Sequence, residues 1–220
     1  MDPELNQHIR SLYNRLTIHP FTGFQDAVMA YSSLTVYYDP YHIYIKEKPS
    51  GTVKDWVSRK LLDAWETIGD RETTKTLHKI PVCYDPEWGM DLENLALTLH
   101  RSLEDLIQWH TAPVYRIYMI GFQPGFPYMG ETPEALQVAR KTKPVQVKAG
   151  SVGIAGRQTG IYPFDSPGGW HIIGRTPVRL FDAAGSPPVP FRPGDEVCFY
   201  SISREQFDQL NKEMYVGSHI

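Results

Sequence analysis

Apolar residues recur at intervals of three and four positions in two segments of the N-terminal third. Residues 5–16 and residues 52–68 both show this spacing, which predicts two amphipathic helices. Thr52 and Asp55 are spaced as a capping box at the start of the second helix. Between the helices, residues 34–38 alternate as a half-buried strand does, and Asp39-Pro40 marks its end. The pattern predicts a small α/β unit that ends in the polar stretch 70–75.

The pattern changes in the rest of the chain. Residues 78–82 and 114–120 are predicted strands, and residues 91–99 and 102–109 are predicted short helices. Residues 121–195 contain 12 of the 17 glycines and 11 of the 18 prolines, which leaves room only for short strands joined by turns. These strands are expected in VQVKAGSV, GIYPF, WHIIGR, VRLFD and EVCFYSI, before a last helix with Phe207 and Leu210. We therefore predict an α+β chain, with a small α/β domain at 1–76 and a β-barrel domain at 77–220.

The composition argues against several classes of protein. A formal net charge of −3 and the lack of a Lys/Arg run provide no basic field for nucleic acid. Cys83 and Cys198 lie far apart and fit neither a disulfide framework nor a zinc pattern, which suits a reducing cytoplasm. The sequence shows no signal peptide and no stretch of about 18 apolar residues. We expect a cytoplasmic protein with no nucleic-acid partner and no membrane partner.

The glycine-rich stretch GSVGIAG at residues 150–156 is open to two interpretations. Its spacing is not that of a dinucleotide-binding loop. Its N–H groups either face an anion beside Arg157, or the stretch is a barrel turn that needs positive φ. Ser151 lacks an assignable base, so a turn serine is the simpler interpretation than a nucleophile. No HxH or HExxH pattern occurs, and we expect no metal site.

His171 and Arg175 are the strongest candidates for chemistry. Gly168 and Gly169 precede them and let a backbone approach closely. In an extended segment the two side chains share one face, where a guanidinium beside a neutral imidazole would suit a carboxylate or a developing oxyanion. The alternative is a strand-edge histidine with a structural arginine.

Aromatic residues gather in the same stretches. Phe122, Phe126 and Tyr128 lie in GFQPGFPYMG at 121–130, and Trp170 follows the two glycines. They could form an aromatic wall around a small ligand, or they could plug one end of the barrel.

The order of these motifs resembles one known family. GFQPGFPYMG is followed by KAGSVGIAGRQTGIYPFDSPGGWHIIGRTP at 148–177, by LFD at 180–182 and by RPGDEVCFYSI at 192–202. Together they are similar to the family of 5-oxoprolinase B subunits, which also contains the sporulation-kinase inhibitor KipI and the domain labelled allophanate hydrolase subunit 1. SSLTVYYDP and IQWHT extend the likeness upstream.

The resemblance implies a small α/β N-terminal domain followed by a cyclophilin-like β-barrel. Members of the family usually begin with a further strand that the printed sequence does not contain, so we expect the N-terminal sheet to lack an edge strand. A misplaced start codon, a function carried by the barrel alone, or a partner that covers the edge would each account for this.

The activity implied by the resemblance is ATP-dependent opening of 5-oxoproline to L-glutamate, shared with separate A and C subunits. A lactam amide is resonance-stabilised, so phosphorylation of its oxygen would make it a better electrophile. No Walker lysine motif occurs here, so we expect no cofactor bound by this chain alone and ATP used by the complex. The isolated chain is expected to be inactive. The alternatives are a KipI-like inhibitor that binds a histidine kinase and a component of urea or allophanate metabolism.

We expect the two motif stretches to meet on one rim of the barrel, where they would form half of a joint site with the C subunit of 5-oxoprolinase. The predicted catalytic residues are His171 and Arg175. The predicted substrate-binding residues are Phe126, Tyr128, Gln158, Tyr162 and Trp170.

Overall fold

The chain divides into two compact units, Met1–Thr74 and Lys75–Ile220. The computed structural model describes residues 2–67 of the first unit and 75–216 of the second. The two units are each folded around their own apolar clusters.

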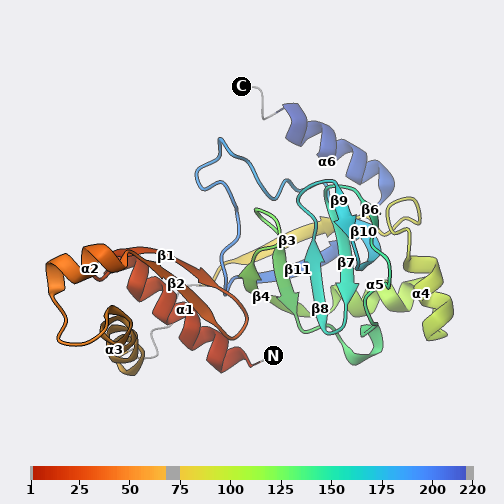
Figure 1. Cartoon of the computed structure of the whole chain (residues 1–220). Coiled ribbons are helices and arrows are strands. Elements are labelled where there is room, and N and C mark those ends of the chain that lie inside the picture. Colours follow the sequence, from red (N-terminus) through yellow and green to blue (C-terminus); the bar gives the residue numbers. More distant parts are fainter. Residues whose placement is uncertain (1, 68–74, 217–220) are drawn as a thin grey trace. The chain divides into compact units, whose positions relative to one another are not determined.

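The first unit consists of a two-stranded hairpin and three helices in its described part (Figure 1). Leu12 and Leu16 of the first helix and Ala64 of the third form the buried centre, on which Phe24 and Val36 from the two strands pack. The side chain of Asp2 caps the first helix, and Thr52 caps the third by accepting a hydrogen bond from the Asp55 N–H at 3.1 Å. The elements are α1 (Pro3–Ile18), β1 (Phe24–Met29), β2 (Leu34–Tyr38), α2 (Pro40–Glu47) and α3 (Val53–Glu66).

The three predicted elements of this unit are confirmed, but β1 and α2 were not predicted. The pairing of β1 with β2 is irregular between Phe24 and Asp26, so its apolar positions do not alternate. Asp39-Pro40 does end β2, but it also starts α2, because the Asp39 side chain accepts from two N–H groups and Pro40 occupies the first turn.

The second unit is built on a curled seven-stranded sheet that forms a half-barrel. The strand order is β10-β7-β8-β5-β4-β11-β3, and β11 is parallel to β3 while it is antiparallel to β4. The two edges meet where Cys83 and Arg175 exchange backbone hydrogen bonds of 2.8 and 2.9 Å. The strands are β3 (Leu77–Val82), β4 (Val114–Ile120), β5 (Pro127–Gly130), β7 (Ser151–Ala155), β8 (Gln158–Ile161), β10 (His171–Arg175) and β11 (Glu196–Ser201).

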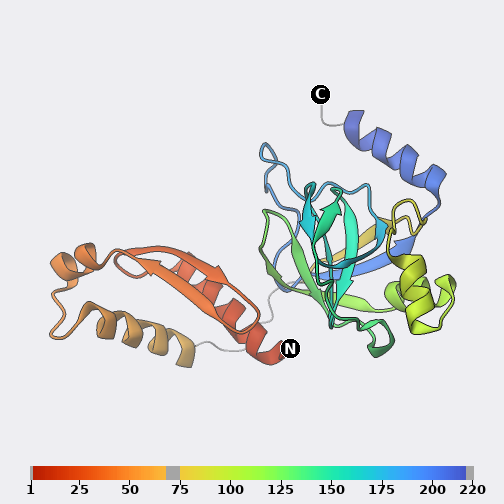
Figure 2. The ribbon, with the colours of Figure 1, turned by 45° about the vertical axis from the view of Figure 1, so that its right-hand side comes forward.

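Helices and a small ribbon surround this sheet (Figures 1 and 2). The helices α4 and α5 supply Leu92, Leu95 and Leu106 to the main core inside the curl. Ser102 and Asp105 form the predicted capping box of α5. These elements are α4 (Leu92–Leu99), α5 (Leu103–Thr111), the short η1 (Glu134–Leu136), the paired strands β6 (Val145–Val147) and β9 (Ser166–Gly168), and α6 (Arg204–Val216).

The sheet is apolar on both faces. Along β7, Val152 and Ile154 belong to the main core, whereas Ala155 belongs to a second, aromatic cluster. Ile172 and Ile173 of β10 are divided between the same two clusters. Because successive strand residues point to opposite faces, the aromatic cluster lies on the face away from the main core.

Two strand predictions need correction. The stretch VRLFD at 178–182 is not a strand, because Val178 donates its N–H to the Thr176 hydroxyl and Asp182 begins a turn to Gly185. VQVKAGSV is two strands, β6 and β7, separated by a turn at Gly150 with φ of 82°. The mixed α and β content and the curled sheet are as expected, while the cyclophilin-like two-domain arrangement stays a prediction.

Candidate functional site

Four of the predicted site residues form one aromatic cluster. The ring of Phe126 lies 4.7 Å from that of Tyr128, 5.1 Å from that of Tyr162 and 5.5 Å from that of Trp170, measured between centroids. They come from the two motif stretches, 121–130 and 160–175, which the sheet brings together. The convergence of the aromatic residues was therefore predictable, and their role in binding substrate stays a prediction.

The glycines of these stretches make room for this cluster. A Cβ on Gly168 would stand 2.7 Å from the hydroxyl of Tyr162, and a Cβ on Gly160 would stand 2.9 Å from the ring of Phe126. Gly169 instead faces Arg140, whose Nη2 would lie 3.5 Å from a Cβ there. A side chain at Gly168 or Gly160 would thus overlap an aromatic residue, which explains the glycines without any ligand.

Most of the cluster is shielded from solvent. Phe126, Tyr162 and Trp170 are buried, Tyr128 is half-buried, and Phe122 at the end of the cluster is 61% exposed. Burial raises the pKa of the Tyr128 and Tyr162 hydroxyls, although the nearby charge of Arg140 opposes this shift in both. Both phenols therefore remain neutral hydrogen-bonding groups. A ligand on this face would contact Tyr128, Phe122 and Arg140 rather than the buried rings.

His171 and Arg175 do not meet at one site. The bulge between Ile172 and Gly174 breaks the alternation along β10, so the argument for a shared face is wrong. His171 Nε2 lies 2.9 Å from the carbonyl oxygen of Ala139, and a carbonyl can only accept, so Nε2 carries the proton. Nδ1 of His171 is buried and has no hydrogen-bond partner among the described residues.

Arg175, the last residue of β10, lies on the opposite face of the strand from His171. Its Nε donates to the carbonyl oxygen of Ala149 at 2.8 Å. Its guanidinium carbon lies 4.7 Å from the ring centroid of Trp88 and 5.7 Å from that of Phe207 in α6. These contacts fix the direction of the guanidinium, since a planar cation packs well against aromatic rings.

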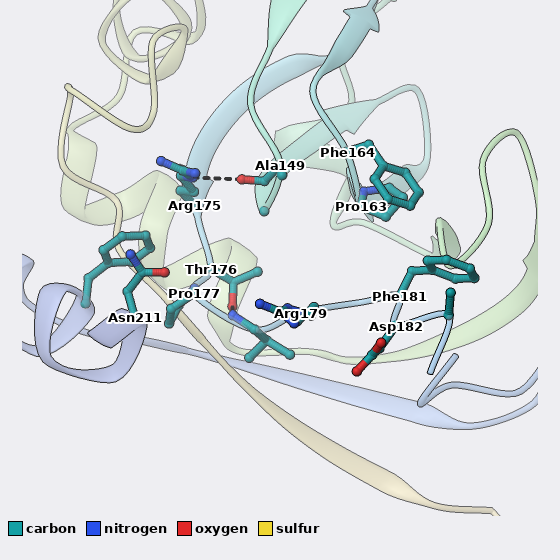
Figure 3. Close-up of a pocket in the computed structure, with 14 residues that line it drawn as sticks. Ala149, Pro163, Phe164, Arg175, Thr176, Pro177, Arg179, Phe181, Asp182 and Asn211 are labelled. Atoms are coloured by element: carbon teal, nitrogen blue, oxygen red, sulfur yellow. Dashed lines mark hydrogen bonds between the residues drawn. The ribbon is translucent and has the colours of Figure 1, made fainter. Parts of the chain in front are cut away.

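A pocket of about 330 Å³ opens beside Arg175 (Figure 3). Arg179 projects into the middle of this view, between Thr176 and Phe181. The pocket is bounded by the turn at Ala149–Gly150, by the Pro163–Phe164 segment, by the irregular chain after β10 and by α6. The lining residues are Ala149, Gly150, Pro163, Phe164, Arg175, Thr176, Pro177, Val178, Arg179, Phe181, Asp182, Ala183, Phe207 and Asn211.

The remaining sequence candidates lie in less favourable places. Gln158 stands opposite Gly130 in the sheet, on the same face of β8 as Gly160, and is near the edge of the aromatic cluster. Arg157 forms an ion pair with Glu131. Ser151 is buried in β7. The barrel-turn interpretation of GSVGIAG is confirmed, because Gly150 and Gly156 have positive φ and the Gly156 N–H bonds to the Val138 carbonyl.

A buried polar network inside the main core was not predicted from the sequence. His110 Nδ1 lies 2.7 Å from the Tyr84 hydroxyl, and its Nε2 lies 2.9 Å from the Thr159 hydroxyl, which donates to the Gly153 carbonyl. This chain of donors assigns the proton to Nε2 and makes Nδ1 the acceptor. Complete burial lowers the pKa of His110 to about 3, so the ring is neutral. The only sequence signal was its place in IQWHT.

No helix in the described residues is long and apolar enough to cross a membrane. Among those residues there is also no group of three or more His, Cys, Asp or Glu side chains that could hold a metal ion.

Comparison with known proteins gives a consistent answer. The family described as carboxyltransferase domain, subdomain C and D, matches residues 1–191. The chain is 39% identical over 221 residues to the 5-oxoprolinase B subunit of Bacillus subtilis, covering 96% of this chain and 90% of that protein. It is 41% identical over 175 residues to the 5-oxoprolinase B subunit of Haemophilus influenzae, covering 79% and 78%.

Solved structures agree in fold. The crystal structure of TTHA0988 matches with a TM-score of 0.80 and 36% identity, over 92% of this chain and 38% of that chain. The urea amidolyase of K. lactis shares the fold at 16% identity and a TM-score of 0.76, over 97% of this chain and 14% of that one. The chain thus spans well under half the length of these two structures. The resemblance drawn from the motifs is confirmed, and the chain belongs to the family of carboxyltransferase domain, subdomain C and D, together with the 5-oxoprolinase B subunits.

Proposed function

We propose that this chain is the B subunit of an ATP-dependent 5-oxoprolinase complex, which opens 5-oxoproline to L-glutamate. The observation that carries the proposal is the identity of about 40% to proteins named as 5-oxoprolinase B subunits, over most of this chain. The reaction class is hydrolysis of a cyclic amide. The complex is proposed to act in the cytoplasm, where the free thiols of Cys83 and Cys198 would stay reduced.

The proposal includes the A and C subunits of 5-oxoprolinase as partners, with the C subunit in direct contact. Matches to segments of longer chains support this part, since this fold makes up 38% of TTHA0988 and 14% of K. lactis urea amidolyase. The same architecture therefore works next to further polypeptide in other proteins. The isolated chain is expected to have no turnover, and ATP is proposed to be used by the assembled complex.

Reconstitution tests the proposal. The chain is co-expressed with candidate A and C subunits from the same genome, and release of glutamate from 5-oxoproline is measured with and without ATP. We expect activity only when all three subunits and ATP are present. Turnover by the isolated chain would contradict the division of labour, and a stable complex without 5-oxoprolinase activity would contradict the substrate.

The same preparation addresses the two alternatives. A histidine kinase inhibitor would lower kinase autophosphorylation in the absence of the A and C subunits, and a component of urea metabolism would require allophanate or urea as substrate. The sequence matches to urea amidolyases cover only about a third of this chain, for example 32% at 37% identity for the protein of Lachancea kluyveri, and the match over 97% of the chain to the K. lactis structure is at 16% identity and concerns the fold alone. The 5-oxoprolinase proposal therefore has the broader support.

A further inference from the structure

The pocket beside Arg175 has an excess of positive charge. Arg175 and Arg179 both line it, and among the described lining residues Asp182 is the one acidic side chain. Asp182 also accepts a hydrogen bond from the Ala184 N–H at 3.0 Å within its own turn. Two guanidinium groups near one cavity favour an anionic ligand, and carboxylate matches the planar fork of arginine.

The cationic side of the pocket is rigid. The Thr176 N–H donates a hydrogen bond of 2.9 Å to the Gly150 carbonyl oxygen. The two backbones are so close that a Cβ on Gly150 would stand 2.3 Å from the Thr176 carbonyl oxygen. Arg175 is bonded to Ala149 and lies against the rings of Trp88 and Phe207. A cation held in this way loses little conformational freedom when an anion binds.

The other walls are apolar. Phe164 and Phe181 pack against each other with centroids 5.6 Å apart, and Phe207, Pro163 and Pro177 complete the lining. A cavity of about 330 Å³ is near the lower limit for small-molecule sites. It suits a compact molecule with one charged end and an apolar body. It does not suit a nucleotide triphosphate, whose several charges would need more than two arginines or a metal.

We infer that this pocket binds a small carboxylic acid with a compact apolar body, with Arg179 facing the carboxylate, Arg175 adding positive charge at the pocket wall, and Phe164 and Phe181 contacting the body. The identity of the ligand rests on the proposed function, under which it is 5-oxoproline, a five-membered lactam with one carboxylate. The aromatic cluster at Phe126 and Trp170 is then a structural support, and the binding residues come from the segment 175–183 that follows β10.

Binding to the isolated full-length chain tests the inference without any turnover. The probes are 5-oxoproline and its uncharged carboxamide. Their binding is measured by isothermal titration calorimetry or NMR. We expect the carboxylate to bind at least tenfold more tightly than the carboxamide, since a hydrogen bond from arginine to a charged acceptor is stronger than one to a neutral acceptor. We expect Arg179→Gln to remove most of this preference.

Arg101→Gln is the matched control. Arg101 lies over the indole of Trp109 at 5.6 Å, as Arg175 lies over that of Trp88, but Arg101 precedes α5 and does not line the pocket. The substitution removes the same charge as Arg179→Gln. This variant should bind 5-oxoproline as the unchanged chain does. Equal loss in both variants would overturn the inference, because the effect would then reflect net charge rather than the pocket.

The two proposals fail in different ways. If the reconstituted complex consumes 5-oxoproline and Arg179→Gln leaves its KM unchanged, the pocket inference is overturned and the proposed function stands. If the isolated chain shows the Arg179-dependent preference for the carboxylate over the carboxamide while the complex has no 5-oxoprolinase activity, the carboxylate pocket stands and the proposed function fails. Binding of carboxylate and carboxamide with equal affinity overturns the inference in either case.

Discussion

At the scale of single residues, small side chains set the shape of the aromatic face. Gly168 and Gly160 are required because Tyr162 and Phe126 occupy the space above them. Gly169, directly beside Gly168, has the end of the Arg140 side chain and the Lys141 carbonyl oxygen nearby, both at ordinary contact distances. Two neighbouring glycines that look equivalent in the sequence thus differ in the reason for their presence.

We predict that Gly168→Ala lowers the free energy of unfolding by about 1–3 kcal/mol, because its Cβ would overlap the packed Tyr162 hydroxyl. Gly169→Ala should change it by less than about 0.5 kcal/mol, since its nearest neighbour is at ordinary contact distance. Urea denaturation measures both. In a Tyr162→Phe background the cost of Gly168→Ala should shrink. An equal cost of the two glycine variants would contradict the packing argument.

The ionisation of His110 links the stability of the chain to pH. It is neutral in the folded chain with a pKa of about 3, against an ordinary value of 6.5. Between these two values the unfolded chain binds the extra proton, so protonation favours unfolding. The contribution of neutral His110 to the free energy of unfolding is therefore fully present above pH 6.5 and is lost as the pH falls towards 3.

We predict that the stability difference between the unchanged chain and His110→Gln depends on pH. The difference should be constant above pH 6.5 and should shift against the unchanged chain by up to about 1.4 kcal/mol per pH unit below it. Carboxylates titrate in both proteins and cancel in the comparison. Urea denaturation from pH 4 to pH 8 gives the measurement, and a difference that is constant over that range would contradict the assignment.

At the scale of elements, most helices were predictable, although α2 was missed, and the strands were predictable only in part. The first and third helices of the first unit and the capped α5 follow from apolar spacing and cap residues, which are local signals. The strands β5, β7 and β10 have apolar residues on both faces, so they lack the alternation that identifies a strand beside solvent. The opposite error occurs at VRLFD, whose apolar residues predict a strand. Leu180 is buried there, but the segment that carries it is irregular.

The candidate site shows the same limit. The convergence of Phe126, Tyr162 and Trp170 could be predicted because their motifs are distinctive. The separation of His171 from Arg175 was not predicted. It depends on a bulge in β10, for which Gly174 inside the strand was the available signal. Arg179 had no such signal, since its neighbours in the pocket come from four separate segments.

Asp91 joins the start of α4, strand β10 and the irregular segment that contains Lys141. Its carboxylate accepts from the Ile172 N–H at 2.7 Å and pairs with Lys141, and its own N–H donates to the Ile172 carbonyl at 3.0 Å. The start of α4 is thereby tied to β10. Both side chains of the ion pair are largely buried, at 16% and 14% exposure.

We predict that Asp91→Ala lowers the free energy of unfolding by about 2–4 kcal/mol, because it leaves a largely buried ammonium and a backbone N–H without partners. The control is Asp165→Ala, whose ion pair with Lys148 is exposed and should cost less than about 1 kcal/mol. Thermal and urea unfolding of both variants measure the contrast. Similar costs would contradict the importance of burial.

At the scale of the whole molecule, the two units have separate apolar centres. Lys75 and Thr76 already belong to the second unit. The Lys75 side chain donates a hydrogen bond to the Glu196 carboxylate, and the Thr76 N–H donates one to the Asp195 carboxylate. We predict that limited trypsin digestion yields a stable C-terminal fragment that begins near residue 75, because each unit has its own core. The expressed segment 75–220 should show a cooperative unfolding transition. A chain that resists cleavage between the units, or a segment that stays unfolded, would contradict this.

The position of β11 has a consequence for synthesis of the chain. It is the last strand to leave the ribosome, yet it inserts between β3 and β4, and residues 83–195 separate it from its parallel partner. Until it emerges, the only sheet contact beside β3 in the described part of the chain is the bridge of the next residue, Cys83, to Arg175, and the side of β4 that β11 will cover is a second unpaired edge. Nascent chains that end before residue 196 would therefore expose two unpaired strand edges at once, so we expect them to associate with other chains unless these edges are covered.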